Sequence, residues 1–163
     1  MVRYAVLTSS DMGAAGERED ISGDTIVEMM SEAGHILNER VIVPDERPRI
    51  AEKLRQWSFS GEVDVVLTTG GTGLGPRDVT PEATAEVIDY EVPGIAEAMR
   101  AKSLKVTPMA MISRGKAGVR GGTLIINLPG SPGGVRDNLE VALPVLAHAS
   151  EILSDRHSGP HPV

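Results

Sequence analysis

The sequence has no cysteine and very few aromatic residues, and each shortage excludes a class of function. Without cysteine the chain can form no disulfide framework, no thiolate zinc site and no cysteine nucleophile. Aromatic residues make up 2% of the chain, too few for the stacking platforms that bind single-stranded nucleic acids. The net charge of −7 disfavours binding to a phosphate backbone or an anionic membrane surface. Nucleic acids and membranes are therefore not expected as partners.

Long hydrophobic runs are absent as well. No segment approaches the roughly 18 consecutive apolar residues of a transmembrane helix, and the first residues lack the apolar core of a signal peptide. We therefore expect a soluble, cytoplasmic protein. The 163 residues, of which 40% are hydrophobic and 24% charged, suit one globular domain. We predict a single domain over residues 1–154 and a flexible tail over residues 155–163, where the sequence is polar and contains proline.

Short apolar segments alternate along the chain with segments of helical periodicity. Strands are predicted over residues 4–8, 40–43, 63–68 and 123–128. Helices are predicted to begin at the N-caps Ser22 and Asp45, at Thr80–Pro81 and at Pro93, and a last one is predicted over residues 135–153 with a kink or break at Pro144. Because continuous apolar strands alternate with helices, the sequence predicts an α/β protein built around a largely parallel sheet.

The most informative segment is the glycine-rich loop over residues 70–75 (GGTGLG), between the third predicted strand and the helix at Thr80. Glycines allow successive backbone N–H groups to point at one place, which makes such a loop beside a helix N-terminus suitable for an anion. The Walker pattern fails because Pro76 and Arg77 stand where it requires Lys and then Ser or Thr. The dinucleotide fingerprint fails because its third glycine position is Pro76. A tight turn without a ligand is the structural alternative.

Further candidate residues are expected at the same rim of the sheet. Asp45 and Asp78 lie beside the loops that follow two predicted strands, and a Gly/Pro-rich segment over residues 127–134 (NLPGSPGG) follows the last one. The carboxyl ends of parallel strands meet at one rim, where open α/β sheets bind ligands. Carboxylates beside a polyphosphate are compatible with a divalent cation such as Mg²⁺ between them. The alternatives are helix capping for Asp45 and an Asx turn for Asp78.

Positive charges also gather between the two glycine-rich loops. Arg114, Lys116 and Arg120 stand out in an acidic chain, and arginine is suited to a terminal phosphate. The alternative is solvated surface charge.

Several motifs occur together in a fixed order: TTGGTG (68–73), PRDVTPEAT (76–84), Pro93-Gly94, Ser113-Arg114, GVRG (118–121) and TLIINLPG (123–130). The ordered set resembles the molybdopterin-binding proteins of molybdenum-cofactor synthesis, in particular the stand-alone molybdopterin adenylyltransferases and the G domain of gephyrin. The resemblance covers nearly the whole chain and is strongest over residues 63–130, whereas residues 12–20 match only loosely. It implies a three-layer α/β/α sandwich, with a mostly parallel sheet and one antiparallel strand, that commonly forms a homotrimer.

The resemblance also implies an activity. Members of the family transfer AMP from ATP to the terminal phosphate of molybdopterin, which gives adenylyl-molybdopterin and pyrophosphate and requires Mg²⁺. Molybdate is inserted afterwards by another domain or protein, which would be a downstream partner. A non-catalytic molybdopterin carrier or scaffold on the same fold remains an alternative, because fold alone does not fix function. A nucleotide-binding regulator that is indifferent to the pterin is a further alternative.

The family's functional residues can be carried over to matching positions of this sequence. The resemblance implies catalytic and metal-binding roles for Asp45 and Asp78. It implies a nucleotide site at Gly70, Gly71, Thr72, Gly73, Pro129, Gly130 and Ser131. It implies a molybdopterin site at Thr8, Ser10, Asp11, Ser113 and Arg114.

Overall fold

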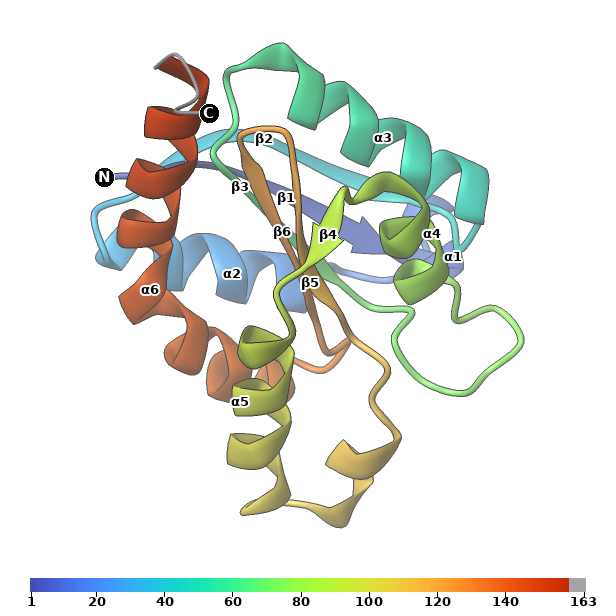
Figure 1. Ribbon diagram of the computed structural model, residues 1–163. Coiled ribbons are helices and arrows are strands. Elements are labelled where there is room, and N and C mark those ends of the chain that lie inside the picture. The colour runs from blue at the N-terminus through green and yellow to red at the C-terminus, as the bar shows by residue number, and fades with distance from the viewer. Residues whose placement is uncertain (159–163) are drawn as a thin grey trace.

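The computed structural model describes residues 1–158, which form one sheet between two layers of helices (Figure 1). The strands are β1 (Arg3–Ser9), β2 (Ile36–Val43), β3 (Val65–Thr69), β4 (Tyr90–Glu91), β5 (Ala117–Arg120) and β6 (Thr123–Leu128). Their order in the six-stranded sheet is β2-β1-β3-β6-β5-β4. The strands β2, β1, β3 and β6 are parallel, β5 is antiparallel to β6, and β4 is antiparallel to β5. Only β5 therefore runs against the common direction.

The helices divide between the two faces of the sheet. They are α1 (Asp11–Ala14), α2 (Ile21–Glu32), α3 (Arg47–Ser60), α4 (Thr80–Val87), α5 (Pro93–Leu104), the 3₁₀ helix η1 (Pro108–Ile112) and α6 (Pro132–Ser158). Buried side chains of α2, α5 and α6 share one hydrophobic cluster with the sheet, and those of α3 and α4 share the other. These two helical layers give the predicted three-layer α/β/α sandwich, which is confirmed.

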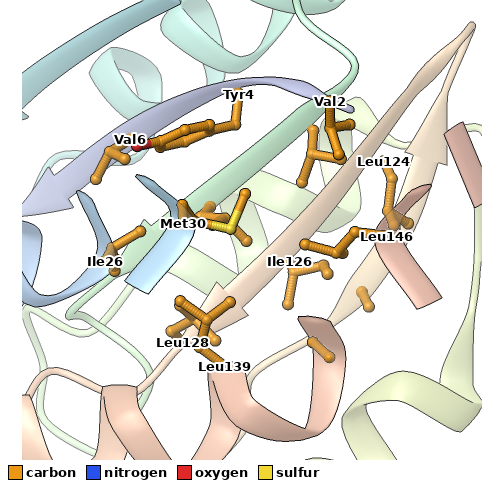
Figure 2. Close-up of a cluster of buried hydrophobic side chains, with 14 of the residues drawn as sticks. Val2, Tyr4, Val6, Ile26, Met30, Leu124, Ile126, Leu128, Leu139 and Leu146 are labelled. Carbon is orange, nitrogen blue, oxygen red and sulfur yellow. The ribbon is translucent and has the colours of Figure 1, made fainter. Parts of the chain in front are cut away.

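The two clusters exist because successive side chains of a strand point to opposite faces. Tyr4 and Val6 of β1 pack with α2 and α6, as Figure 2 shows, whereas Ala5 and Leu7 pack against α3. On β6, Ile126 belongs to the first cluster and Ile125 to the second. A strand buried on both faces reads as a continuous apolar run, which is why these strands were predictable.

The predicted strands all exist, and three of the four have shifted ends. The strand over residues 123–128 is confirmed residue for residue, and the one over 40–43 is the second half of β2. The two strands β4 and β5 were not predicted, because they are two and four residues long and β5 (AGVR) carries no continuous apolar run. On α3, Ile50, Leu54 and Trp57 are spaced by four and three residues, which places them on one helical face, and all three are buried against the sheet.

Two predicted N-caps are wrong. The N-cap of α2 is Asp20, whose carboxylate accepts a hydrogen bond of 2.9 Å from the Gly23 N–H. Ser22 instead lies in the first turn and donates its hydroxyl to the carbonyl of Gly130. Helix α3 begins at Arg47 after Glu46, so Asp45 does not cap it. The side chain of Asp45 is used elsewhere, as described below.

The C-terminal helix is longer than predicted. It begins at Pro132 and continues without a break past Pro144 to Ser158. It therefore includes the first four residues of the predicted tail, and the rest of that tail, residues 159–163, lies outside the described residues. No helix within residues 1–158 is both long and apolar enough to cross a membrane.

The central strand β6 offers a test of how the core is built. Ile126 has no exposed surface, so Ile126→Ala is expected to lower the free energy of unfolding by about 2–5 kcal/mol, measured by chemical denaturation. Ile152→Ala on α6 is the control, because that side chain is 44% exposed and little apolar contact is lost. Equal effects of the two substitutions would contradict this placement of the core.

Candidate functional site

The loops that follow β1, β2, β3 and β6 meet at one rim of the sheet and enclose a cavity of about 630 Å³. This first cavity brings together eight of the residues singled out from the sequence: Thr8, Ser10, Asp45, Gly70, Gly71, Asp78, Gly130 and Ser131. Residues from four separate strand ends thus line one space. The expectation that the strand ends create a common rim is confirmed.

The glycine loop after β3 has a backbone that side chains would disrupt. Gly70 and Gly71 have φ values of +90° and +69°, which L-residues with side chains rarely adopt. A Cβ on Gly70 would lie 2.4 Å from the carbonyl oxygen of Ser9. Thr80 holds the loop from the other side, because its hydroxyl donates to the Gly70 carbonyl and its N–H donates to the Gly71 carbonyl. The glycines are therefore required by close backbone contacts.

The loop after β6 lies directly against the glycine loop. The hydroxyl of Thr69 donates a hydrogen bond of 2.6 Å to the Pro129 carbonyl. A Cβ on Gly130 would lie 3.4 Å from the Cα of Gly70. The two loops that were predicted to hold one ligand are thus neighbours in space.

Asp45 lies at the opposite side of the first cavity and is fixed by the end of β1. Its carboxylate accepts hydrogen bonds from the Ser9 hydroxyl at 2.5 Å and from the Asp11 N–H at 3.0 Å. In return, the Asp45 N–H donates to the carboxylate of Asp11 at 2.9 Å. This reciprocal pairing joins the loops after β1 and β2 and orients the Asp45 carboxylate along the rim.

Arg77 extends this pairing to the glycine loop. Its guanidinium donates two hydrogen bonds to the Asp11 carboxylate, at 3.0 and 2.9 Å. These bonds, together with the one from the Asp45 backbone, hold the pKa of the Asp11 carboxyl below its ordinary value. Sequence reasoning missed the contributions of both Ser9 and Arg77. Arg77 lies inside a motif used for the resemblance and Ser9 lies between the predicted residues Thr8 and Ser10, but only the fold reveals which way their side chains point.

Asp78 is turned back onto the glycine loop. Its carboxylate accepts a hydrogen bond of 2.8 Å from the Gly75 N–H, and its own N–H donates to the Gly75 carbonyl. A Cβ on Gly73 or on Gly75 would lie 2.9 Å from this carboxylate. A side chain at either position would therefore crowd the Asp78 carboxylate and force it to shift.

A second cavity of about 370 Å³ lies on the other side of the glycine loop. Four of the predicted residues line it: Thr72, Ser113, Pro129 and Ser131. Ser131 lines both cavities, so the two spaces adjoin at the loop after β6. The predicted residues Asp11, Gly73 and Arg114 contribute to the lining of neither cavity. Arg114 instead points toward the back of the glycine loop, where it lines a third cavity, of about 420 Å³, between α4 and α5.

The acidic residues of the first cavity fit a magnesium ion that is shared with phosphate. Among the side chains of residues 1–155, no group of three or more His, Asp or Glu is placed to hold a metal ion. Mg²⁺ needs no such cage, because it is commonly bound by one or two carboxylates together with phosphate oxygens and water. Asp45 and Asp78 supply two carboxylates to one space. This donor set suits Mg²⁺ that arrives with a phosphate ligand.

The other predicted cations have surface partners. Lys116 forms an ion pair of 2.7 Å with Glu91, and Arg120 one of 2.8 Å with Asp89. Arg120 lies in β5 and Lys116 directly precedes it, so both pairs connect this segment to residues 89–91 at the edge of the sheet. The alternative interpretation, solvated surface charge, is the correct one for these two residues.

An open α/β sheet with a glycine-rich, carboxylate-bearing cavity at its carboxyl rim is typical of α/β proteins that bind phosphorylated small molecules. The family described as "Probable molybdopterin binding domain" matches residues 5–148. The chain belongs to this family, as the ordered motifs predicted.

Similar proteins match along almost the whole chain. A molybdopterin adenylyltransferase from Helicobacter pylori is 42% identical over 156 residues, which cover 93% of this chain and 88% of that protein. The molybdenum cofactor synthesis protein cinnamon from Drosophila melanogaster is 40% identical over 94% of this chain and 26% of its own length. The molybdopterin biosynthesis enzyme MoaB from Thermus thermophilus has 52% sequence identity to this chain. Its crystal structure matches with a TM-score of 0.89 over 95% of this chain and 98% of that one.

The pair of Asp11 and Arg77 has a pH-dependent consequence. Since the pKa of Asp11 is lowered on folding, its ionised form stabilises the folded state above the ordinary value of 3.8, and this contribution is lost as the pH falls through the lowered pKa. Arg77→Met is expected to return the Asp11 pKa toward 3.8, measured by NMR titration of the carboxyl carbon. Arg55→Met is the control, because Arg55 pairs with Glu86. An Asp11 pKa that Arg77→Met leaves unchanged would contradict the assignment.

Proposed function

We propose that this protein is a molybdopterin adenylyltransferase, which transfers AMP from ATP to the terminal phosphate of molybdopterin. An oxygen of that phosphate attacks the α-phosphorus of ATP, the bond from this phosphorus to the bridging oxygen breaks, and pyrophosphate leaves with that oxygen. The observation that carries the proposal is the first cavity, where the glycine loop and the carboxylates of Asp45 and Asp78 meet. The relatives named molybdopterin adenylyltransferase support the same activity.

The chemistry asks for positioning and charge neutralisation more than for a general base, because the attacking phosphate is already a nucleophile. Backbone N–H groups of residues 70–73 would hold phosphate oxygens of ATP. Asp45 and Asp78 would hold Mg²⁺, which would offset the negative charge of the triphosphate. The absence of cysteine and the lack of histidine from both cavity linings are compatible with such a mechanism.

The two adjoining cavities suit a reaction of two substrates. One substrate would occupy the first cavity, beside Thr8 and Ser10, and the other the second cavity, beside Ser113. Ser131 belongs to both, so the phosphates to be joined would meet at the rim between the loops after β3 and β6. Glycines at this junction leave room for the crowded phosphorus centre.

The resemblance supports three further proposals. ATP is used as its magnesium complex, the chain assembles into a homotrimer, and the adenylylated product is passed to a protein that inserts molybdate. We further propose that the protein acts in the cytoplasm.

Asp78 provides the sharpest test of the activity. Asp78→Asn is expected to reduce the rate of adenylyl transfer by about 100-fold or more, because a preorganised charge at the reacting phosphate is lost. The assay follows adenylyl-molybdopterin and pyrophosphate from ATP, Mg²⁺ and molybdopterin. Asp155→Asn, an exposed residue at the end of α6, is the control. A wild-type protein that binds the pterin without forming product would favour the carrier instead of the enzyme.

The glycine loop can be tested by binding alone. Gly70→Ala is expected to weaken binding of Mg·ATP by at least about 10-fold, since its Cβ would collide with the carbonyl oxygen of Ser9 and displace the loop. Titration calorimetry measures the affinity. Gly94→Ala in the first turn of α5 is the control, because its Cβ would meet open space. An unchanged affinity of Gly70→Ala for Mg·ATP would contradict a role of the glycine loop in nucleotide binding.

A further inference from the structure

Arg114 forms three hydrogen bonds with residues 72–78, which leaves its guanidinium engaged with the protein and not turned toward a ligand. Its backbone N–H donates to the Thr72 carbonyl at 2.9 Å. Its Nε donates to the Gly73 carbonyl at 2.8 Å, and one terminal nitrogen donates to the Asp78 carbonyl at 2.8 Å. The other terminal nitrogen donates to the carboxylate of Glu82 on α4. Arg114 alone thus joins both ends of the loop between β3 and α4.

The contacts of Arg114 fall on both sides of the loop's middle, where Arg77 pairs with Asp11. Residues 74–77 are exposed, so no core packing fixes the path of the chain between Gly73 and Asp78. The planar guanidinium donates from three nitrogens in a rigid fork, which sets the separation of the Gly73 and Asp78 carbonyls. The carboxylate of Asp78 is then directed by the Gly75 N–H, which lies inside the same segment. Arg114 therefore controls where the Asp78 carboxylate stands.

One carboxylate oxygen of Glu82 lacks a hydrogen-bond partner in this arrangement. This oxygen is buried, although the side chain as a whole is 39% exposed, and among the side chains of residues 1–155 it is the one buried polar atom without a hydrogen-bond partner. A buried acceptor without a partner destabilises the folded state and calls for an explanation. Glu82 fixes the guanidinium of Arg114 from the helix side, and this orientation explains why a carboxylate occupies the position. Its pKa lies below the ordinary value, mainly because of the hydrogen bond from Arg114.

We propose that Arg114, oriented by Glu82, is a positioning residue that fixes the glycine loop and the Asp78 carboxylate, and that it does not bind the pterin phosphate. This role adds a residue to the proposed function. It rests on that function only in the experiment that measures the rate of adenylyl transfer. It differs from the role implied by the family resemblance. It explains why Arg114 lines neither the first nor the second cavity.

Kinetics distinguish the two roles. If Arg114 positions Asp78, Arg114→Met lowers kcat by about 10–100-fold and leaves the KM for molybdopterin within about twofold, as expected for a supporting residue. Arg114→Lys recovers only part of the loss, because an ammonium cannot satisfy the separate carbonyls as a fork does. Glu82→Gln also lowers kcat, by a smaller factor than Arg114→Met does. A large increase in KM for molybdopterin with kcat retained would overturn the proposal and restore Arg114 as a phosphate ligand.

A second measurement is independent of catalysis. Hydrogen exchange of the unliganded protein, followed by mass spectrometry, should show faster exchange over residues 72–79 in Arg114→Met and unchanged exchange in the sheet. Arg120→Met is the matched control, because Arg120 forms an ion pair of similar exposure with Asp89. Unchanged exchange over residues 72–79 would overturn the positioning role. If the wild-type protein formed no adenylyl-molybdopterin, the proposed function would fail, and the exchange experiment would still decide the role of Arg114.

Discussion

The close approach of two backbones at Gly70 is the constraint on which the site depends. The carbonyl of Ser9 at the end of β1 lies too near Gly70 to admit a larger residue there, and the chain at Gly130 after β6 packs against Gly70 from another strand end. Because three strand ends converge there, the loops after β1, β3 and β6 form one rim instead of three separate turns. Backbone N–H groups and the carboxylates of Asp45 and Asp78 thereby face a common space. The glycines serve the geometry of the rim and leave room for a phosphate at the same time.

Polar contacts hold this rim from two sides. On one side Asp11 pairs with Asp45 and Arg77, and on the other Arg114 spans the loop to Glu82. Exposed ion pairs contribute little to stability individually, so their value here lies in orientation. Many of these bonds involve backbone N–H or carbonyl groups, which fix the path of the chain and not just a side chain. A rim that must bring carboxylates to a polyphosphate needs such support, because the charges repel until a cation joins them.

The sequence predicted the layers of the fold better than the details of the site. Strands such as residues 123–128 are apolar on both faces, and that signal survives without tertiary information. The strand β5 gave no such signal, because its small residues pair only in the context of β4 and β6. Asp45 shows the limit for single residues: a carboxylate before a helix suits a cap or a ligand site equally, and only the contacts with Ser9 and Asp11 distinguish them. Likewise, nothing in the sequence reveals that the Arg114 side chain points behind the loop.

The most direct measurement is the position of the metal and the triphosphate in a crystal of the protein with Mn²⁺ and α,β-methylene-ATP, which cannot be cleaved at the α–β link. Anomalous scattering locates the manganese independently of the nucleotide. We expect one manganese within about 2.2 Å of oxygens of Asp45 and Asp78, with the triphosphate over Gly70 and Gly71. Manganese and triphosphate bound away from the first cavity, with both carboxylates left unliganded, would contradict the assignment of this rim as the site of adenylyl transfer.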